Sequence, residues 1–198
     1  MTGHLIAASC FAPMTVAAPA AVLTFGSNLA PEAAGAKGSG SVSVDYDNVA
    51  HTLTIDVSWT RLSGATTVSH IHCCVAPPGT VGVAATPGTL PLFPNGVTSG
   101  AYMVTLDLTD GASYTAGYLA GGTAADGEAK LLQGLLDGQA YLNIHTSTFG
   151  AGEIRGFLSA APEPGTVDLV GLALARHRAP PPSLTGLGRR TRDSRLPW

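Results

Sequence analysis

Apolar and polar side chains alternate in short runs between residues 21 and 160, with turn-forming residues between the runs. In the clearest run, His51–Thr60, every second residue from Leu53 to Trp59 is apolar, and the residues between them are Thr, Asp or Ser. A period of two is typical of a β-strand that buries one face. The pattern also predicts strands at Ser41–Asp47, Thr67–Cys73, Gly100–Thr109, Ala140–Thr146 and Gly152–Leu158.

One segment, Asp126–Gly138, has helical periodicity, and it begins and ends at residues that commonly cap helices. Its apolar residues at helical spacing are Ala129, Leu132, Leu135 and Leu136. The segment Ala76–Gly100 is rich in Pro and Gly, which predicts an irregular connection. Several short strands with one short helical insertion indicate an all-β fold. We expect an antiparallel β-sandwich or barrel, either immunoglobulin-like or a Greek key like that of superoxide dismutase.

Charged residues make up only 12% of the chain, about half the usual share. Residues 1–160 carry 4 basic and 10 acidic side chains, whereas residues 161–198 carry 6 Arg and 3 acidic side chains. An acidic body is poorly matched to phosphate backbones, which excludes nucleic acid as the expected partner. Low charge combined with many short strands is instead typical of exported β-rich proteins.

Residues 1–21 are apolar, rich in small side chains, and end in Ala17–Ala21, which is similar to a signal-peptidase site. They lack the basic region that begins a complete signal peptide, so we expect the remnant of an export signal. Export would place the remaining chain, a β domain at residues 22–160 and a tail at 161–198, in the periplasm, at the cell surface or outside the cell.

Four ordered motifs give residues 22–158 a resemblance to a known family. The motifs are an L-x-G turn at Leu62–Gly64, H-I-H at His70–His72, N-x-H-T at Asn143–Thr146 and G-E-I-R-G at Gly152–Gly156. In this order and spacing they resemble the chordin-type (CHRD) domain of exported bacterial proteins. The resemblance implies an all-β extracellular domain, and it implies no established enzymatic activity.

The last part of the chain, residues 161–198, resembles a Pro-Glu-Pro (PEP-CTERM) C-terminal sorting segment. Pro162–Pro164 is followed by the apolar run Val167–Ala175 and then by an Arg- and Pro-rich tail. A membrane-spanning helix needs about 20 apolar residues, but this run is shorter and contains Asp168. The sorting segment is therefore degenerate, and we expect at most a transient association with the membrane.

The pair His70 and His72 is the strongest candidate for metal chemistry. In a strand both side chains point to the same face, about 6.5–7 Å apart along it. His145 lies on another predicted strand, so the three imidazoles converge if these strands are neighbours, and such a group suits Cu or Zn. The alternative is structural, with rings that hydrogen-bond to backbone carbonyls or to side chains such as Asn143. The distances among the three histidines decide between these interpretations.

Cys73 and Cys74 directly follow the histidine pair. Paired cysteines in an exported protein usually form disulfides, and adjacent ones can pair by closing an eight-membered ring. We therefore expect a vicinal disulfide or a free thiol pair, in preference to thiolate ligation of Cu or Zn.

Glu153 and Arg155 are two residues apart on a predicted strand, so we expect their side chains to share a face and form a structural ion pair. Catalytic residues are not indicated by the sequence. Ser, His and Asp are all present, but the chain has neither a nucleophile elbow nor a phosphate-binding glycine loop.

Two functional hypotheses follow from these features. The first is an exported, non-enzymatic module of the cell envelope or extracellular matrix, which binds an extracellular protein or polysaccharide or has a structural role. The second is a Cu- or Zn-binding metalloprotein that uses His70, His72 and His145. Metal analysis of the chain with and without the histidine pair separates the two hypotheses.

Overall fold

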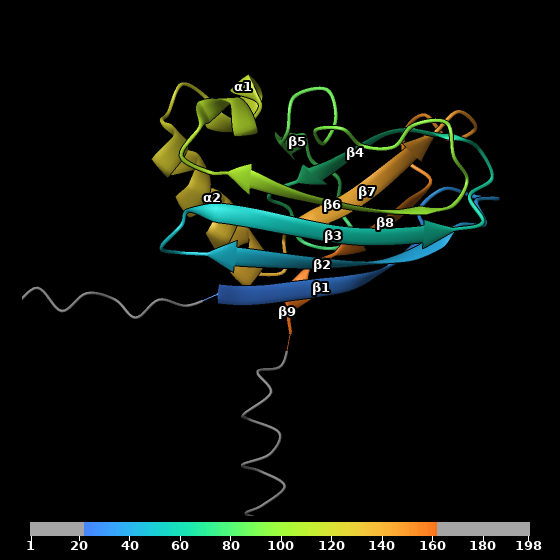
Figure 1. Ribbon diagram of the computed structural model, residues 1–198, viewed down its shortest axis with the longest axis horizontal. Helices are drawn as coiled ribbons and strands as arrows, with labels where there is room; N and C mark the ends of the chain where they lie inside the picture. The colour runs from blue at the N-terminus through green and yellow to red at the C-terminus, as the bar shows by residue number, and fades with distance from the viewer. Residues whose placement is uncertain (1–21, 162–198) are drawn as a thin grey trace, which may run out of the picture. The chain divides into compact units, whose positions relative to one another are not determined.

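The period-two runs form antiparallel β-strands in a computed structural model of the chain, which describes residues 22–161 (Figure 1). The strands of this range are β1 Val22–Pro31, β2 Ser39–Asp47, β3 Thr52–Thr60, β4 Thr66–His72, β5 Val83–Ala85, β6 Gly100–Asp107, β7 Tyr141–Thr146, β8 Ile154–Phe157 and β9 Ser159–Ala160. The expected export signal at residues 1–21 and the expected sorting segment, from Pro162 onward, lie outside the described residues.

The strands join in one sheet that curls over on itself at β1. The strand order is β5-β4-β7-β8-β1-β2-β3-β6, with β9 paired to β1 beside this path. Most of β1 pairs with β2, whereas its last two residues, Ala30 and Pro31, pair with β8. Strands β1, β2, β3 and β6 therefore form one layer, and β8, β7, β4 and β5 form the other (Figure 1). The predicted all-β antiparallel fold is confirmed, in the form of a curled half-barrel.

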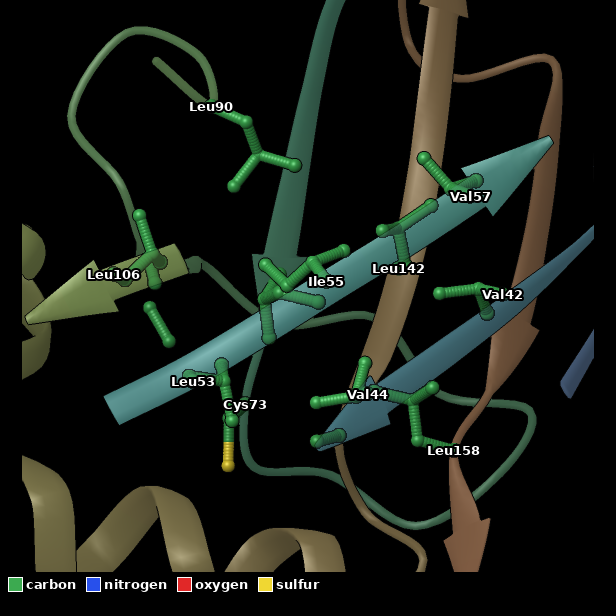
Figure 2. Packing of buried hydrophobic residues seen from close by; sticks show 14 of the residues in the cluster. Val42, Val44, Leu53, Ile55, Val57, Cys73, Leu90, Leu106, Leu142 and Leu158 are labelled. Atoms are coloured by element: carbon green, nitrogen blue, oxygen red, sulfur yellow. The ribbon is translucent and has the colours of Figure 1, made fainter. Parts of the chain in front are cut away.

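The core lies between the two layers and is built from alternate residues of the strands (Figure 2). Leu53, Ile55 and Val57 of β3 are fully buried, as their alternation predicts. Leu142 and Ile144 of β7 are fully buried in the opposite layer. Each such side chain contributes about 1.5–3 kcal/mol when it leaves water. Because neighbouring side chains of a strand point to opposite faces, the residues that alternate with this core lie on the outer face of the sheet.

The predicted helix is present as α2, Ala124–Leu136, but its first turn and its buried face differ from the prediction. Thr123, not Asp126, is the N-cap, and Asp126 accepts from the Thr123 backbone N–H in a capping box. Ala129 and Leu136 are exposed. The buried face consists of Gly127, Glu128, Leu131, Gly134 and Leu135. Two glycines on this face permit close contacts, Gly127 with the segment around α1 and Gly134 with Cys73 and Cys74. A count of apolar residues does not detect such contacts.

Two further helical turns and three strands, β1, β5 and β9, were not predicted from the sequence. The turns are η1, Gly111–Ser113, and α1, Ala116–Leu119, which begin after the capping residues Asp110 and Thr115. Strand β5 lies inside the connection that we expected to be irregular and pairs with the end of β4. Elements of two to four residues carry too little periodicity to be recognised, and in β1 the polar Ser27 interrupts the apolar alternation between Phe25 and Leu29. In Figure 1 the helices gather at one end of the sheet.

Candidate metal centre

Strands β4 and β7 bring the three candidate histidines together on the outer face of one layer. In their antiparallel register, His70 lies opposite Asn143 and Val68 lies opposite His145. Ile71 of β4 is fully buried in the core, so His70 and His72 on either side of it point outward. The same alternation directs Asn143 and His145 outward from β7. Strands β4 and β7 are therefore neighbours, which was the condition for the three imidazoles to converge.

The three imidazoles are close enough to share one ion. One ring nitrogen from each of His70, His72 and His145 lies within 4.8 Å of the other two. The ring centroids of His70 and His145 are 5.3 Å apart, and those of His70 and His72 are 5.7 Å apart. Three atoms separated by at most 4.8 Å all lie within about 2.8 Å of a common point, compared with Zn–N bonds of about 2.0–2.1 Å. Small side-chain rotations would close this difference.

Each imidazole also donates a hydrogen bond to a backbone carbonyl of a different loop. His70 Nε2 lies 3.0 Å from the carbonyl oxygen of Gly88, between β5 and β6. His72 Nδ1 lies 2.7 Å from that of Val81, between β4 and β5, and His145 Nδ1 lies 2.9 Å from that of Gly150, between β7 and β8. A carbonyl oxygen only accepts, so each of these nitrogens carries hydrogen. A neutral ring then carries a lone pair on its second nitrogen.

The second nitrogens of the three rings have no ordinary hydrogen-bond donor within the part of the chain that the structure describes. His70 Nδ1 is buried without a hydrogen-bond partner. His72 Nε2 and His145 Nε2 lie 3.2 and 3.1 Å from Oδ1 of Asn143. That oxygen is also an acceptor, so it does not supply a hydrogen to either ring.

Burial favours the neutral form of the two β4 histidines. His70 and His72 are only 7% and 8% exposed. Their burial lowers the pKa of both imidazoles below the ordinary value, because surroundings poor in water disfavour the cation. The nearby His145 lowers the pKa of both further, although hydrogen bonds to carbonyl oxygens oppose the shift. Neutral imidazole is the form that binds metal ions.

Two side chains behind the histidines, Tyr141 and Arg155, support the site. Tyr141 stacks on His72, with parallel rings 4.7 Å apart. The guanidinium of Arg155 donates to the carbonyl oxygens of Pro78 and Gly79, in the loop that supplies the Val81 carbonyl. Metal-binding histidines usually have such orienting partners behind them. Sequence patterns did not identify these partners, because they lie in segments that are distant in sequence.

The structure corrects the expected ion pair between Glu153 and Arg155. Arg155 Nε pairs instead with Glu32, 3.2 Å from Oε2. Glu153 is fully buried and accepts hydrogen bonds from the backbone N–H groups of Ser63 and Gly64 and from the Thr146 hydroxyl. Glu153 precedes β8, so the alternation of that strand does not govern the direction of its side chain.

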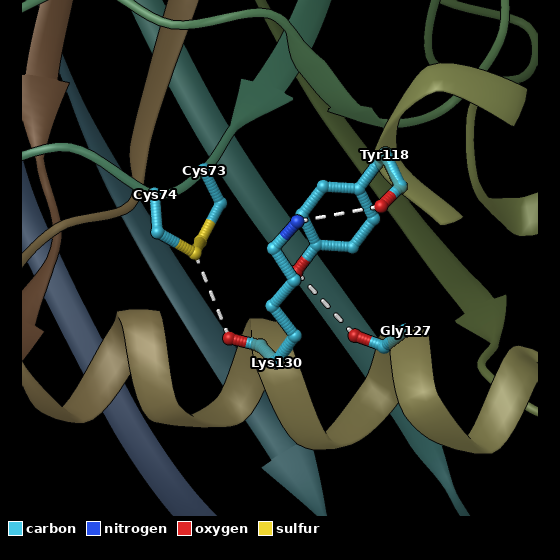
Figure 3. Close-up of a disulfide and its surroundings, with 5 residues drawn as sticks. All are labelled: Cys73, Cys74, Tyr118, Gly127 and Lys130. Carbon is cyan, nitrogen blue, oxygen red and sulfur yellow. Dashed lines mark hydrogen bonds between the residues drawn. A yellow bond between two sulfur atoms is a disulfide. The ribbon is translucent and has the colours of Figure 1, made fainter. Parts of the chain in front are cut away.

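Cys73 and Cys74 form a disulfide with each other and lie next to α2 (Figure 3). Cys74 Sγ lies 3.6 Å from the carbonyl oxygen of Lys130. A Cβ atom added to Gly134 would collide with both sulfur atoms, so this glycine permits the contact. Among residues 22–161, the group of metal-ligating side chains consists of histidines and includes neither cysteine.

Comparison with known proteins identifies the domain. The family model described as CHRD domain matches residues 20–158. No curated protein and no solved structure matches the chain. Within residues 22–161, no helix is long and apolar enough to cross a membrane.

Proposed function

The chain belongs to the CHRD-domain family, and from this premise we propose that it is an exported β domain that binds one Cu or Zn ion. The ligands are His70 Nδ1, His72 Nε2 and His145 Nε2. CHRD domains are typically extracellular or secreted. In this proposal the domain is a non-enzymatic module of the envelope or extracellular matrix, and the ion helps to fix the three loops that the histidines contact.

The distribution of hydrogen bonds around the rings carries this proposal. Histidines that only pin strands together would find a donor or an acceptor of the right kind at both nitrogens. Here each ring directs an N–H to a carbonyl, the remaining nitrogens of His72 and His145 face the same oxygen, and that of His70 is buried without a partner, while one nitrogen of each ring lies within 4.8 Å of the other two. Convergent lone pairs repel one another, whereas a cation between them converts that repulsion into three bonds. Neutral imidazole suits both Zn and Cu.

The burial of the three rings also fits an ion that enters from one side. His70 and His72 are buried, whereas His145 is partly exposed. The exposed ring gives an ion a path to the two buried nitrogens.

Metal analysis of the full chain tests the proposal. The wild-type protein is loaded with Zn or Cu, freed of unbound metal and analysed for metal content beside a His70→Ala/His72→Ala variant and a His51→Ala control. His51 lies away from the centre and pairs with Glu128. We expect one ion per chain in the wild type and the control, and less than a tenth of that in the double variant. Circular dichroism checks that each variant is folded.

A single His145→Gln variant tests the same ligand set at a less buried position. Its loss of bound metal would support the proposal even if the double variant did not fold. A wild-type protein without stoichiometric Zn or Cu after loading would refute the proposal.

A further inference from the structure

We propose that Asn143 is a fourth ligand of this centre, through Oδ1, and that Glu32 is the residue that orients it. The inference rests on the proposed function, and it predicts a closed site of three nitrogens and one oxygen. Asn143 is 3% exposed and lies in the middle of the histidine group, opposite His70 in the sheet register.

The distances around Asn143 Oδ1 fit a shared ion. The oxygen lies 3.2 Å from His72 Nε2 and 3.1 Å from His145 Nε2. Both rings direct their N–H groups to carbonyls, so the oxygen and the two nitrogens face one another with lone pairs. In a tetrahedral site with bonds of about 2 Å, neighbouring ligand atoms are about 3.3 Å apart. Asn143 Oδ1 is therefore already at the spacing of a neighbouring ligand from both nitrogens.

Glu32 selects this orientation of the Asn143 amide. Rotating the amide by half a turn would let Nδ2 donate to both histidines, and in the absence of other partners that orientation would be preferred. However, Asn143 Nδ2 donates to Glu32 Oε1 at 3.3 Å. Rotation would replace this donor with Oδ1, so that two acceptors, Asn143 Oδ1 and Glu32 Oε1, would face each other. Arg155 Nε holds the other carboxylate oxygen at 3.2 Å. The carboxylate thus keeps Oδ1 directed at the histidines.

Gly152 leaves the space that this contact needs. Its φ is +128°, a conformation that favours glycine. A Cβ atom at this position would overlap Glu32 Oε1 and come within 2.9 Å of Asn143 Nδ2. The glycine of the closing G-E-I-R-G motif therefore protects the orienting hydrogen bond.

An amide oxygen also narrows the choice of metal. Carbonyl oxygen is a hard ligand, whereas Cu(I) prefers soft thiolate and thioether ligands. Cys73 and Cys74 are bonded to each other and face α2, so neither supplies a thiolate to the centre. We therefore expect the centre to prefer Zn(II) or Cu(II) over Cu(I).

Zn(II) affinity and Co(II) spectra of the full chain test this inference. Zn(II) affinity is measured by competition with a chromophoric chelator for the wild type, Asn143→Ala, Asn143→Asp, Glu32→Gln and the control Asn28→Ala. Asn28 is an exposed residue of β1. We expect Asn143→Ala and Glu32→Gln to weaken Zn(II) binding by about 10–100-fold. Asn143→Asp should retain or increase the affinity, because its carboxylate oxygen can ligate, and the control should not change it.

The Co(II)-loaded proteins give a readout that a purely structural role would not alter. The visible absorption bands should change in Asn143→Ala, Asn143→Asp and Glu32→Gln, and should match the wild type in the control. If Asn143→Ala does not fold, Asn143→Asp and Glu32→Gln carry the test. Wild-type affinity and an unchanged spectrum in the Asn143 variants would refute the fourth ligand and leave the three-histidine centre standing. Wild-type affinity in Glu32→Gln would refute the orienting role, and a wild-type protein that binds no Zn(II) would refute the proposed function itself.

Discussion

The buried carboxylate of Glu153 provides a sharp test of how the two layers are held together. It lies between β7 and β8 and accepts hydrogen bonds from the loop between β3 and β4, at the backbone N–H groups of Ser63 and Gly64. A third hydrogen bond comes from the Thr146 hydroxyl, 2.7 Å from Oε2. All three partners donate. Replacing Glu153 with Gln keeps the shape of the side chain, but it directs an NH₂ group, itself a donor, at one or two of these donors.

The cost of Glu153→Gln follows from these contacts. A hydrogen bond to a charged group contributes about 1.5–3 kcal/mol. The Gln oxygen can replace one carboxylate oxygen, so the variant loses one or two such bonds. We therefore expect the free energy of unfolding to fall by about 2–4 kcal/mol at pH 7. This is a large part of the total stability of about 5–15 kcal/mol that a domain usually has.

The effect should also depend on pH in a defined direction. Burial alone would raise the pKa of Glu153, but the hydrogen bonds from Ser63, Thr146 and Gly64 outweigh it and hold the pKa below its ordinary value of 4.5. The unfolded chain therefore takes up a proton at a higher pH than the folded chain. The stabilisation by Glu153 is present above pH 4.5 and is lost as the pH falls through the lower, folded-state value. The difference between wild type and Glu153→Gln should shrink accordingly.

Urea unfolding of both proteins between pH 7 and pH 3, followed by circular dichroism, measures this difference. The exposed Asp56 of β3 supplies a control, and Asp56→Asn should change the unfolding free energy by less than about 0.5 kcal/mol. A Glu153→Gln protein as stable as the wild type at pH 7 would contradict the assigned hydrogen bonds. A difference that stays constant down to pH 3 would contradict the assigned shift in pKa.

Three further predictions concern α2 and its contacts. Gly134→Ala should lower the unfolding free energy by about 1–3 kcal/mol, because the new Cβ would overpack against the disulfide. The control Gly117→Ala has open space around its new Cβ and should not lower it. Equal effects of the two variants in urea unfolding would contradict the close contact between Gly134 and the disulfide. Cys73 and Cys74 should resist alkylation until a reductant is added, and peptide mass spectrometry that finds both alkylated in the unreduced protein would exclude the disulfide. Burial and a hydrogen bond to the Glu128 carboxylate raise the pKa of Tyr46 to about 12, so the stabilisation by this tyrosine is present below pH 10 and is lost as the pH rises through about 12. Tyr46→Phe should therefore lose less stability than the wild type over this range, and parallel pH profiles of the two proteins would refute the assigned shift.

Six of the nine strands that the structure describes could be predicted from the sequence, because alternation is a local signal. His51–Thr60 needed no knowledge of its partners, and its apolar residues are buried as expected. Helix α2 was recognised, but its buried face was misplaced. Gly127 and Gly134 lie on that face because they let neighbouring segments come close to the helix, and they add no apolar side chain that a sequence pattern could detect. Short elements such as β5 depend on pairing with a distant strand.

The candidate site was predictable only in part. The H-x-H spacing places His70 and His72 on one face in any strand, but their approach to His145 depends on the register of β4 and β7. Glu32 lies just past β1 and reaches Asn143 only because the sheet curls and pairs β1 with β8. The same curl gives Arg155 a partner far away in sequence, which a local i, i+2 argument could not find.

The protonation pattern of the ring nitrogens is the most direct test of the three-histidine centre. Long-range ¹H–¹⁵N spectra of the Zn(II)-loaded, ¹⁵N-labelled chain report which nitrogen of each assigned imidazole carries hydrogen. We expect hydrogen on Nε2 of His70 and on Nδ1 of His72 and His145, and a metal-induced shift of the resonances of the other three nitrogens. Spectra unchanged by Zn(II), or hydrogen on the three convergent nitrogens in the loaded protein, would contradict this expectation.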